Sequence, residues 1–238
     1  MKRLILLTFL LPATLLSLAI NAQKEDADTL RISILGDSYS TYEGYLTPDT
    51  NAIWYYKPEN KQLNKENNVR HVEETWWYQV IKQMQAQLEI NNSYSGATIC
   101  YTGYDKKDYS DRAFITRSNK LGNPDVILIC GGTNDSWADA PIGEYVYGNW
   151  SREQLYSFRP AMAKLLLDLK ANYPTARLLF MLNSELKPEI NESVHTICRH
   201  YGVSCLDLQE IEKQWGHPSV AGMKAIANQV VNQLKNNY

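Results

Sequence analysis

The chain has 238 residues, of which 44% are hydrophobic and 21% charged, and its formal net charge is −2. This length can bury one well-packed core, and the balanced charge lacks the basic excess that nucleic-acid binding requires. The four cysteines show neither a CxxC pair nor zinc-type spacing, although Cys198 and Cys205 could pair in an oxidising compartment.

The first 22 residues have the pattern of a secretory signal peptide. Lys2 and Arg3 precede an apolar run over 4–20, and Ala22 offers a small residue for cleavage. An uncleaved membrane anchor is the alternative, but the run is short for a span and no basic cluster follows it. We therefore expect a secreted or periplasmic protein without a stable membrane anchor, whose mature chain begins near Gln23.

Apolar runs and helical patterns alternate along the mature chain. Buried strands are predicted at 30–35, 88–92, 125–130, 177–182 and 204–208. Helices are predicted at 75–87, 160–171, 190–200 and 219–234. Apolar strands that alternate with helices are typical of a parallel sheet covered on both faces, so 23–238 is expected to be one doubly wound α/β domain.

The stretch at about 39–74 has neither a strand nor a helix pattern, and we interpret it as a long insertion. A loop of this length in a compact domain is usually functional or disordered. Its aromatic residues argue against disorder, so a functional role is expected.

Chemically useful residues follow four of the predicted strands. Ser38 follows the first, Gly96 the second, Asn134 the third and His217 the fifth. In open α/β sheets, ligands bind at the carboxyl ends of the strands, so we expect these residues at one edge. A histidine can accept the proton of a serine hydroxyl and so activate it for acyl transfer. The N–H groups of Ser38 and Gly96 and the amide of Asn134 could then hold the oxyanion.

Each of the four residues lies in a short motif. The motifs are I-L-G-D-S, N-S-Y-S-G-A, G-G-T-N-D and G-H-P-S. Any one of them also fits an ordinary turn, but together they resemble the SGNH hydrolases of the GDSL esterase/lipase superfamily. The resemblance implies a flavodoxin-like three-layer α/β/α sandwich with a five-stranded parallel sheet. It also implies a Ser38 nucleophile, a His217 base and the same oxyanion donors, with no metal or organic cofactor.

One position departs from the family pattern. The family usually has an Asp three residues before the histidine, where this chain has Gln214. Either Glu212 or, less favourably, Glu210 reaches the ring, or Gln214 or a backbone carbonyl fixes the tautomer in a Ser-His dyad. The third alternative is a degenerate protein that binds its ligand without turnover.

Aromatic residues gather in the loops that follow the strands. Four of them are expected to bind substrate: Tyr39, Tyr42, Trp54 and Trp137. Aromatic faces stack on sugar rings, whereas a long acyl chain would need a continuous aliphatic groove, and these loops offer little Leu, Ile or Val. We therefore expect a small-molecule or glycan ester substrate, above all an acetyl ester on carbohydrate. The alternatives are a lysophospholipase- or thioesterase-like lipid hydrolase and a non-catalytic glycan-binding protein; the sequence makes no prediction of oligomeric state.

Overall fold

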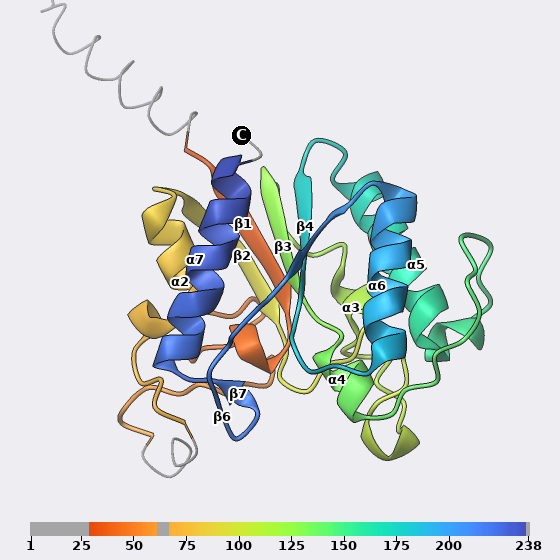
Figure 1. Ribbon diagram of the computed structural model, residues 1–238, viewed down its shortest axis with the longest axis horizontal. Helices are drawn as coiled ribbons and strands as arrows, with labels where there is room; N and C mark the ends of the chain where they lie inside the picture. The colour runs from red at the N-terminus through yellow and green to blue at the C-terminus, as the bar shows by residue number, and fades with distance from the viewer. Residues whose placement is uncertain (1–28, 61–66, 237–238) are drawn as a thin grey trace, which may run out of the picture.

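The computed structural model describes residues 29–60 and 67–236, so the predicted signal peptide at 1–22 lies outside the described residues. The centre of the protein is a five-stranded parallel sheet in the order β2-β1-β3-β4-β5 (Figure 1). The strands are β1 (Arg31–Gly36), β2 (Gln87–Ser93), β3 (Val126–Cys130), β4 (Arg177–Leu182) and β5 (Ser204–Asp207). All five predicted strands are confirmed, each to within one residue at either end.

Helices cover both faces of the sheet, which confirms the three-layer α/β/α architecture (Figure 1). One face carries α2 (Trp76–Gln83) and α7 (Val220–Asn236). The other face carries α3 (Phe114–Arg117), α5 (Phe158–Asn172) and α6 (Pro188–Tyr201).

The central strand β3 explains why the apolar runs lack alternation. Val126, Leu128 and Cys130 pack into the core beneath α2 and α7. Ile127 and Ile129 pack into the core beneath α5 and α6. Since successive side chains of a strand point to opposite faces, and both faces are covered, every position of β3 is apolar and buried.

The helix predicted at 75–87 is shorter than expected. It ends at Gln83, and Gln85 takes a left-handed conformation with a φ of 51°. This turn reverses the chain so that β2 can begin at Gln87. The residues up to 87 continue the helical pattern, but pairing of Gln87 with Arg31 in the sheet overrides it.

Short elements surround the carboxyl ends of the strands. They are the 3₁₀ turn η1 (Ser38–Ser40), α4 (Thr133–Trp137) and a hairpin of β6 (Lys213–Gln214) and β7 (His217–Pro218). The sequence pattern did not predict the hairpin, because each strand has only two residues.

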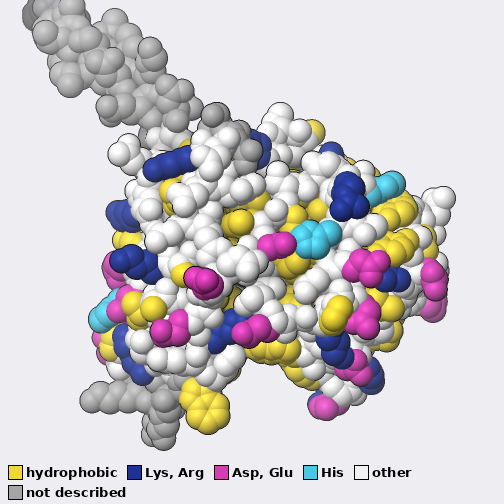
Figure 2. Space-filling model, in the orientation of Figure 1, with side chains coloured by type: hydrophobic (Ala, Val, Ile, Leu, Met, Phe, Trp, Pro, Cys, Tyr) yellow, Lys and Arg dark blue, Asp and Glu magenta, His cyan; other side chains and the backbone are white. Residues whose placement is uncertain are grey.

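The surface gives two further findings. Basic and acidic side chains are interspersed on the face shown in Figure 2, in keeping with the small net charge. Within residues 29–60 and 67–236, no helix combines the length and the apolar character needed to cross a bilayer.

Candidate active site

Ser38 and His217 meet at the carboxyl edge of the sheet. The Oγ of Ser38 lies 2.9 Å from Nε2 of His217, and Nδ1 of the same ring lies 3.0 Å from the carbonyl oxygen of Trp215. A carbonyl oxygen can only accept, so Nδ1 must carry the proton of the neutral ring. Nε2 is therefore the unprotonated nitrogen and can accept the proton of the Ser38 hydroxyl.

Two of the side chains expected to hold this ring, Gln214 and Glu212, hydrogen-bond elsewhere in the structure. The Oε1 of Gln214 accepts a hydrogen bond from the Asn68 N–H at 2.9 Å. The Oε1 of Glu212 accepts one from the hydroxyl of Ser219. The partner of the ring in the structure is the backbone carbonyl of Trp215, which was one of the alternatives that the sequence left open.

A tight turn brings that carbonyl to the ring. Gln214 pairs with His217 across the β6–β7 hairpin, leaving Trp215 and Gly216 as a two-residue loop. Both have positive φ, 53° and 75°, as a type I′ turn requires. A Cβ at Gly216 would also lie 3.0 Å from the Trp137 side chain, so glycine suits the position on two grounds.

Aromatic side chains enclose the histidine ring. The Trp54 indole stacks on it with centroids 3.6 Å apart and planes 7° from parallel. Trp137 meets it edge-on at 6.0 Å. His217 is only 6% exposed, and this burial lowers its pKa to about 4, although the hydrogen bond to Trp215 opposes the shift.

Two of the four residues expected to bind substrate are buried. Tyr39 is 0% exposed; its hydroxyl donates to the Gly216 carbonyl at 2.6 Å and accepts from Asn183 at 3.1 Å. Tyr42 is 3% exposed, and its hydroxyl donates to the carbonyl of Arg70. Both therefore support the loops as packing residues and present no face to a ligand. Trp54 is partly exposed and Trp137 is 44% exposed, so both stay candidates for substrate contact.

The expected oxyanion donors follow three adjacent strands. Gly36 pairs with Ser93 of β2 on one side and with Cys130 of β3 on the other, so the segments bearing Ser38, Gly96 and Asn134 leave the sheet together. Gly96 has a φ of 80° and open space where a Cβ would stand. Within the described part of the chain, the N–H groups of Ser38 and Gly96 have no acceptor.

The Asn134 amide is held from both ends. Its Nδ2 donates to the Ala97 carbonyl at 3.0 Å, and its Oδ1 accepts from the Tyr104 hydroxyl at 2.8 Å. An amide nitrogen has two hydrogens, so one is left for a ligand. Tyr104 is a positioning residue that the sequence analysis missed, since its loop lies thirty residues from Asn134 and no short motif joins them.

Two buried carboxyl groups anchor the loops beside the site. Asp37 accepts from the Tyr39 N–H, and Asp135 accepts from the N–H groups of Ile99 and Cys100. Desolvation raises the pKa of Asp37 to about 7 and that of Asp135 to about 6. The aspartates of G-D-S and G-T-N-D thus shape the backbone around their neighbours, a role that their place in the motifs could have indicated.

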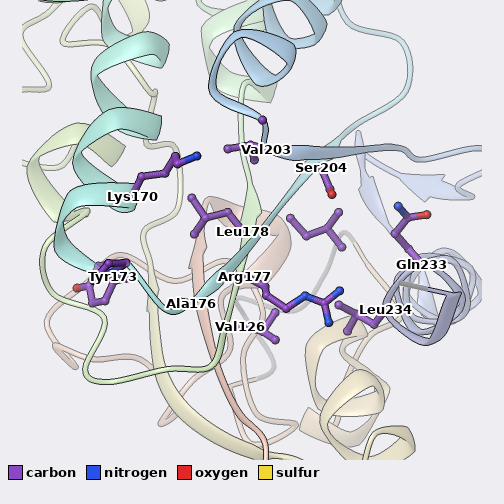
Figure 3. Close-up of a pocket in the computed structure, with 13 residues that line it drawn as sticks. Val126, Lys170, Tyr173, Ala176, Arg177, Leu178, Val203, Ser204, Gln233 and Leu234 are labelled. Carbon is purple, nitrogen blue, oxygen red and sulfur yellow. The ribbon is translucent and has the colours of Figure 1, made fainter. Parts of the chain in front are cut away.

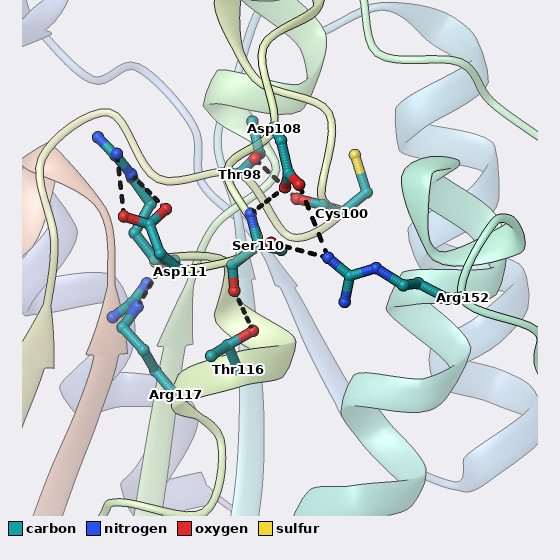
Figure 4. A network of polar contacts seen from close by, with 9 residues as sticks. Thr98, Cys100, Asp108, Ser110, Asp111, Thr116, Arg117 and Arg152 are labelled. Atoms are coloured by element: carbon teal, nitrogen blue, oxygen red, sulfur yellow. Dashed lines mark hydrogen bonds and ion pairs between the residues drawn. The ribbon is translucent and has the colours of Figure 1, made fainter.

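The loop that carries Gly96 is tied down further along its length (Figure 4). The Arg152 guanidinium donates to the Ser110 hydroxyl, and Thr116 donates to the Ser110 carbonyl. Arg117 is buried and donates to the carbonyls of Arg112, Gly36 and Asn92. These contacts fix the loop to the ends of β1 and β2.

The insertion holds the histidine loop from the other side. The Tyr55 hydroxyl donates to the Pro218 carbonyl at 2.9 Å, and the Asn67 amide donates to the same oxygen at 3.0 Å. Tyr55 is 1% exposed and packs in the core beneath α2 and α7. These contacts attach the described parts of 39–74 to the loop that carries His217.

Other features lie away from Ser38. A cavity of about 280 Å³ is lined by Val126, Arg177 and Ser204, at the amino ends of the strands (Figure 3). Among the residues that the structure describes, one group could hold a metal ion, formed by His195, Cys205 and Asp207 on α6 and β5. Neither feature belongs to the Ser38–His217 site.

Comparisons with known proteins agree with this geometry. The family model for GDSL-like lipase/acylhydrolase matches residues 30–234. A GDSL-like lipase structure from Bacteroides ovatus is 53% identical, with a TM-score of 0.84, covering 88% of this chain and 99% of that chain. A second, from Bacteroides uniformis, is 54% identical, with a TM-score of 0.85 and coverages of 87% and 96%.

A more distant structure shares the fold. An acetyl xylan esterase from the rumen bacterium Butyrivibrio proteoclasticus is 16% identical, with a TM-score of 0.51, covering 87% of this chain and 64% of that one. No curated protein matches the sequence.

Proposed function

This chain belongs to the GDSL-like lipase/acylhydrolase family and is an ester hydrolase of the SGNH type, and on that premise we propose that it removes short acyl groups, acetyl above all, from carbohydrate by a Ser-His mechanism. The observation that carries the proposal is the 2.9 Å contact of Ser38 Oγ with the unprotonated nitrogen of His217.

The first half of the reaction forms an acyl-enzyme. The Oγ of Ser38 attacks the ester carbonyl carbon while Nε2 of His217 takes the hydroxyl proton. The N–H groups of Ser38 and Gly96 and the free amide hydrogen of Asn134 hold the oxyanion. The tetrahedral intermediate then collapses, its C–O bond to the sugar breaks, and the leaving sugar oxygen takes the proton from Nε2.

The second half repeats these steps with water. His217 takes one proton from a water molecule, whose oxygen attacks the acyl carbon bound to Ser38. Collapse returns the proton to Ser38 Oγ and releases the carboxylic acid. The enzyme is regenerated without any other co-reactant.

In both halves the positive imidazolium forms with no carboxylate of the described residues hydrogen-bonded to the ring, whose partners there are Trp215 and Ser38. The Trp215 carbonyl accepts from Nδ1, and the Trp54 face lies 3.6 Å from the ring. A cation over an aromatic face gains about 0.5–2 kcal/mol, the larger figure applying where water is excluded. Trp54 therefore supplies part of the stabilisation that a neighbouring Asp would provide.

The aromatic setting favours sugar esters over long-chain lipids. Trp54 and Trp137 border His217, and Trp137 is 44% exposed. Such faces stack on sugar rings, whereas a long acyl chain would need an aliphatic groove. The shared fold of the acetyl xylan esterase is consistent with this substrate class. Residues 1–22 support a secreted or periplasmic location, where glycan esters would be met.

The test is acetate release by the mature chain from acetylated xylo-oligosaccharides, beside p-nitrophenyl acetate, butyrate and octanoate. We expect turnover of acetate to exceed that of octanoate, and Ser38→Ala to abolish both turnover and labelling by a fluorophosphonate. Ser204→Ala is the matched control, since Ser204 is exposed at the opposite end of the sheet.

The rival functions give different results. A preference for octanoate would support the lipid hydrolase instead. Wild-type turnover no faster than that of Ser38→Ala, on both the synthetic and the glycan esters, would refute the esterase. In that case unchanged binding of acetylated oligosaccharide by both proteins would establish the glycan-binding alternative.

A further inference from the structure

A histidine, a cysteine and an aspartate converge where α6 meets the edge strand β5. The Nε2 of His195 lies 3.3 Å from Oδ1 of Asp207, and the Sγ of Cys205 lies 3.8 Å from the same oxygen. The ligand atoms of all three residues lie within 4.8 Å of one another. We propose that these three side chains form a binding site for a divalent transition-metal ion of the Zn²⁺ class, separate from the Ser38–His217 site.

The distances fit a tetrahedral ion. Zn²⁺ binds nitrogen and oxygen at about 2.0–2.2 Å and sulfur at about 2.3 Å, which places tetrahedral ligand atoms about 3.3–3.6 Å apart. The His195–Asp207 separation lies in this range, and the Cys205–Asp207 separation exceeds it by a few tenths of an ångström. An imidazole, a thiolate and a carboxylate are also the donor types that Zn²⁺ accepts.

Local structure explains why the group forms. His195 and Cys198 are three residues apart on α6 and lie on one face of the helix. Cys205 and Asp207 are two apart on β5 and point to one side of the strand. Cysteine spacing alone gives no zinc pattern here, because the other two ligands come from a helix face and a strand end.

The fourth coordination position has room for water or a ligand. A cavity of about 240 Å³ is lined by His195 and Asp207 together with Asn183 and Asn191. Asn183 is only 3% exposed, and its Oδ1 has no hydrogen-bond partner among the described residues. A buried polar oxygen without a partner is costly, so this wall of the cavity is suited to a bound polar group.

Cys198 lies next to the proposed metal site. Its thiol shares a hydrogen bond with Cys205, which together with burial raises the pKa of Cys198 well above its usual range. Both cysteines are free thiols in the structure. Cys198 therefore lies beside the Cys205 sulfur, in the place from which groups behind a metal ligand commonly donate a hydrogen bond.

The metal would join α6 to the edge of the sheet. Among the described residues β5 pairs only with β4, and the residues of β5 are half-buried or exposed. A ligand that binds the folded state and not the unfolded state raises the free energy of unfolding. A metal at this place would therefore stabilise the attachment of β5, the least buried strand of the sheet.

The experiment is a Co²⁺ titration of the tag-free mature chain under a non-thiol reductant. We expect one equivalent to give the visible bands of a tetrahedral site and a near-ultraviolet sulfur-to-cobalt band, both removed by Zn²⁺. Cys205→Ser should abolish the sulfur band, and His195→Ala and Asp207→Asn should each weaken binding at least tenfold. Zn²⁺ should raise the melting temperature of the wild type by several degrees and leave that of Cys205→Ser unchanged.

Two matched variants make the test decisive. Cys198→Ser keeps a hydroxyl beside the thiolate and cannot form a disulfide, so it should retain the sulfur band. His200→Ala, on the same helix but stacked on Tyr147, should bind like the wild type. Absence of one-to-one binding in folded Cys198→Ser, or a sulfur band that survives Cys205→Ser, would overturn the proposal. None of these readouts depends on ester hydrolysis.

Discussion

Replacing Trp54 by alanine should move the acid limb of the pH–rate profile toward neutral pH. His217 acts as the base only in its neutral form, and burial holds its pKa at about 4. Trp54 covers one face of the ring at 3.6 Å, so its removal admits water and stabilises the charged form. Because of the lowered pKa, His217 stays neutral in mild acid. In Trp54→Ala, His217 should be protonated there, and activity should fall.

The size of the effect follows from the shift. A rise from about 4 to the usual value of about 6.5 would lower the neutral fraction at pH 5 from about 90% to about 3%. That is an upper bound of about 30-fold on the loss of kcat/KM at pH 5 relative to neutral pH. Removal of the Trp54 indole also removes its attraction for the His217 imidazolium, which by itself would lower the pKa of His217. That attraction is about 0.5–2 kcal/mol, which is smaller than the roughly 3 kcal/mol that corresponds to the whole shift caused by burial.

The assay is kcat/KM for p-nitrophenyl acetate between pH 3.5 and 8, with the His217 ring proton followed by NMR over the same range. Trp54→Phe keeps an apolar ring and should leave the acid limb near that of the wild type. Tyr45→Ala, an exposed aromatic of the same insertion, is the matched control. An acid limb that stays in place in Trp54→Ala would refute the argument that this indole sets the pKa of His217.

Three further substitutions test the rest of the site. Asn134→Ala should lower kcat by about 10²–10³ with little change in KM, measured with the acetate ester, because an oxyanion donor acts in the transition state. Tyr104→Phe should lower kcat by about tenfold, since the Asn134 amide then loses one of the two contacts that orient it; an unchanged kcat would show that the Ala97 contact suffices. Glu212→Gln and Gln214→Ala should each keep kcat within about threefold, because the two side chains accept hydrogen bonds from Ser219 and Asn68 and not from the His217 ring. A hundredfold loss in either would show that the ring has another partner during turnover.

The centre of the sheet was predictable because β3 is apolar on both faces. Ile127 and Ile129 pack on one side and Val126, Leu128 and Cys130 on the other, so burial appears as a continuous run in the sequence. The helix over 75–87 was predicted too long because a helical pattern does not reveal the left-handed residue at Gln85 that ends it.

The residues that follow the strands were predictable for the same reason, since parallel strands deliver their ends to one edge. The partner of His217 could be predicted only as one of several alternatives, because a backbone carbonyl has no residue type by which to recognise it in the sequence. The nearest signal was the W-G pair between two short stretches, where two positive φ values mark a type I′ turn. The burial of Tyr39 and Tyr42 could not be predicted either, since the sequence alone does not distinguish a loop tyrosine that packs against the protein from one that contacts a ligand.

In Trp215 the backbone and the side chain have different roles. Its carbonyl orients the histidine, while its indole is 75% exposed. Substitution of the side chain leaves the carbonyl in the chain, so alanine scanning would pass over the acceptor that sets the tautomer. The indole can therefore vary during adaptation to new esters while the ring keeps its orientation, provided that Gly216 preserves the turn.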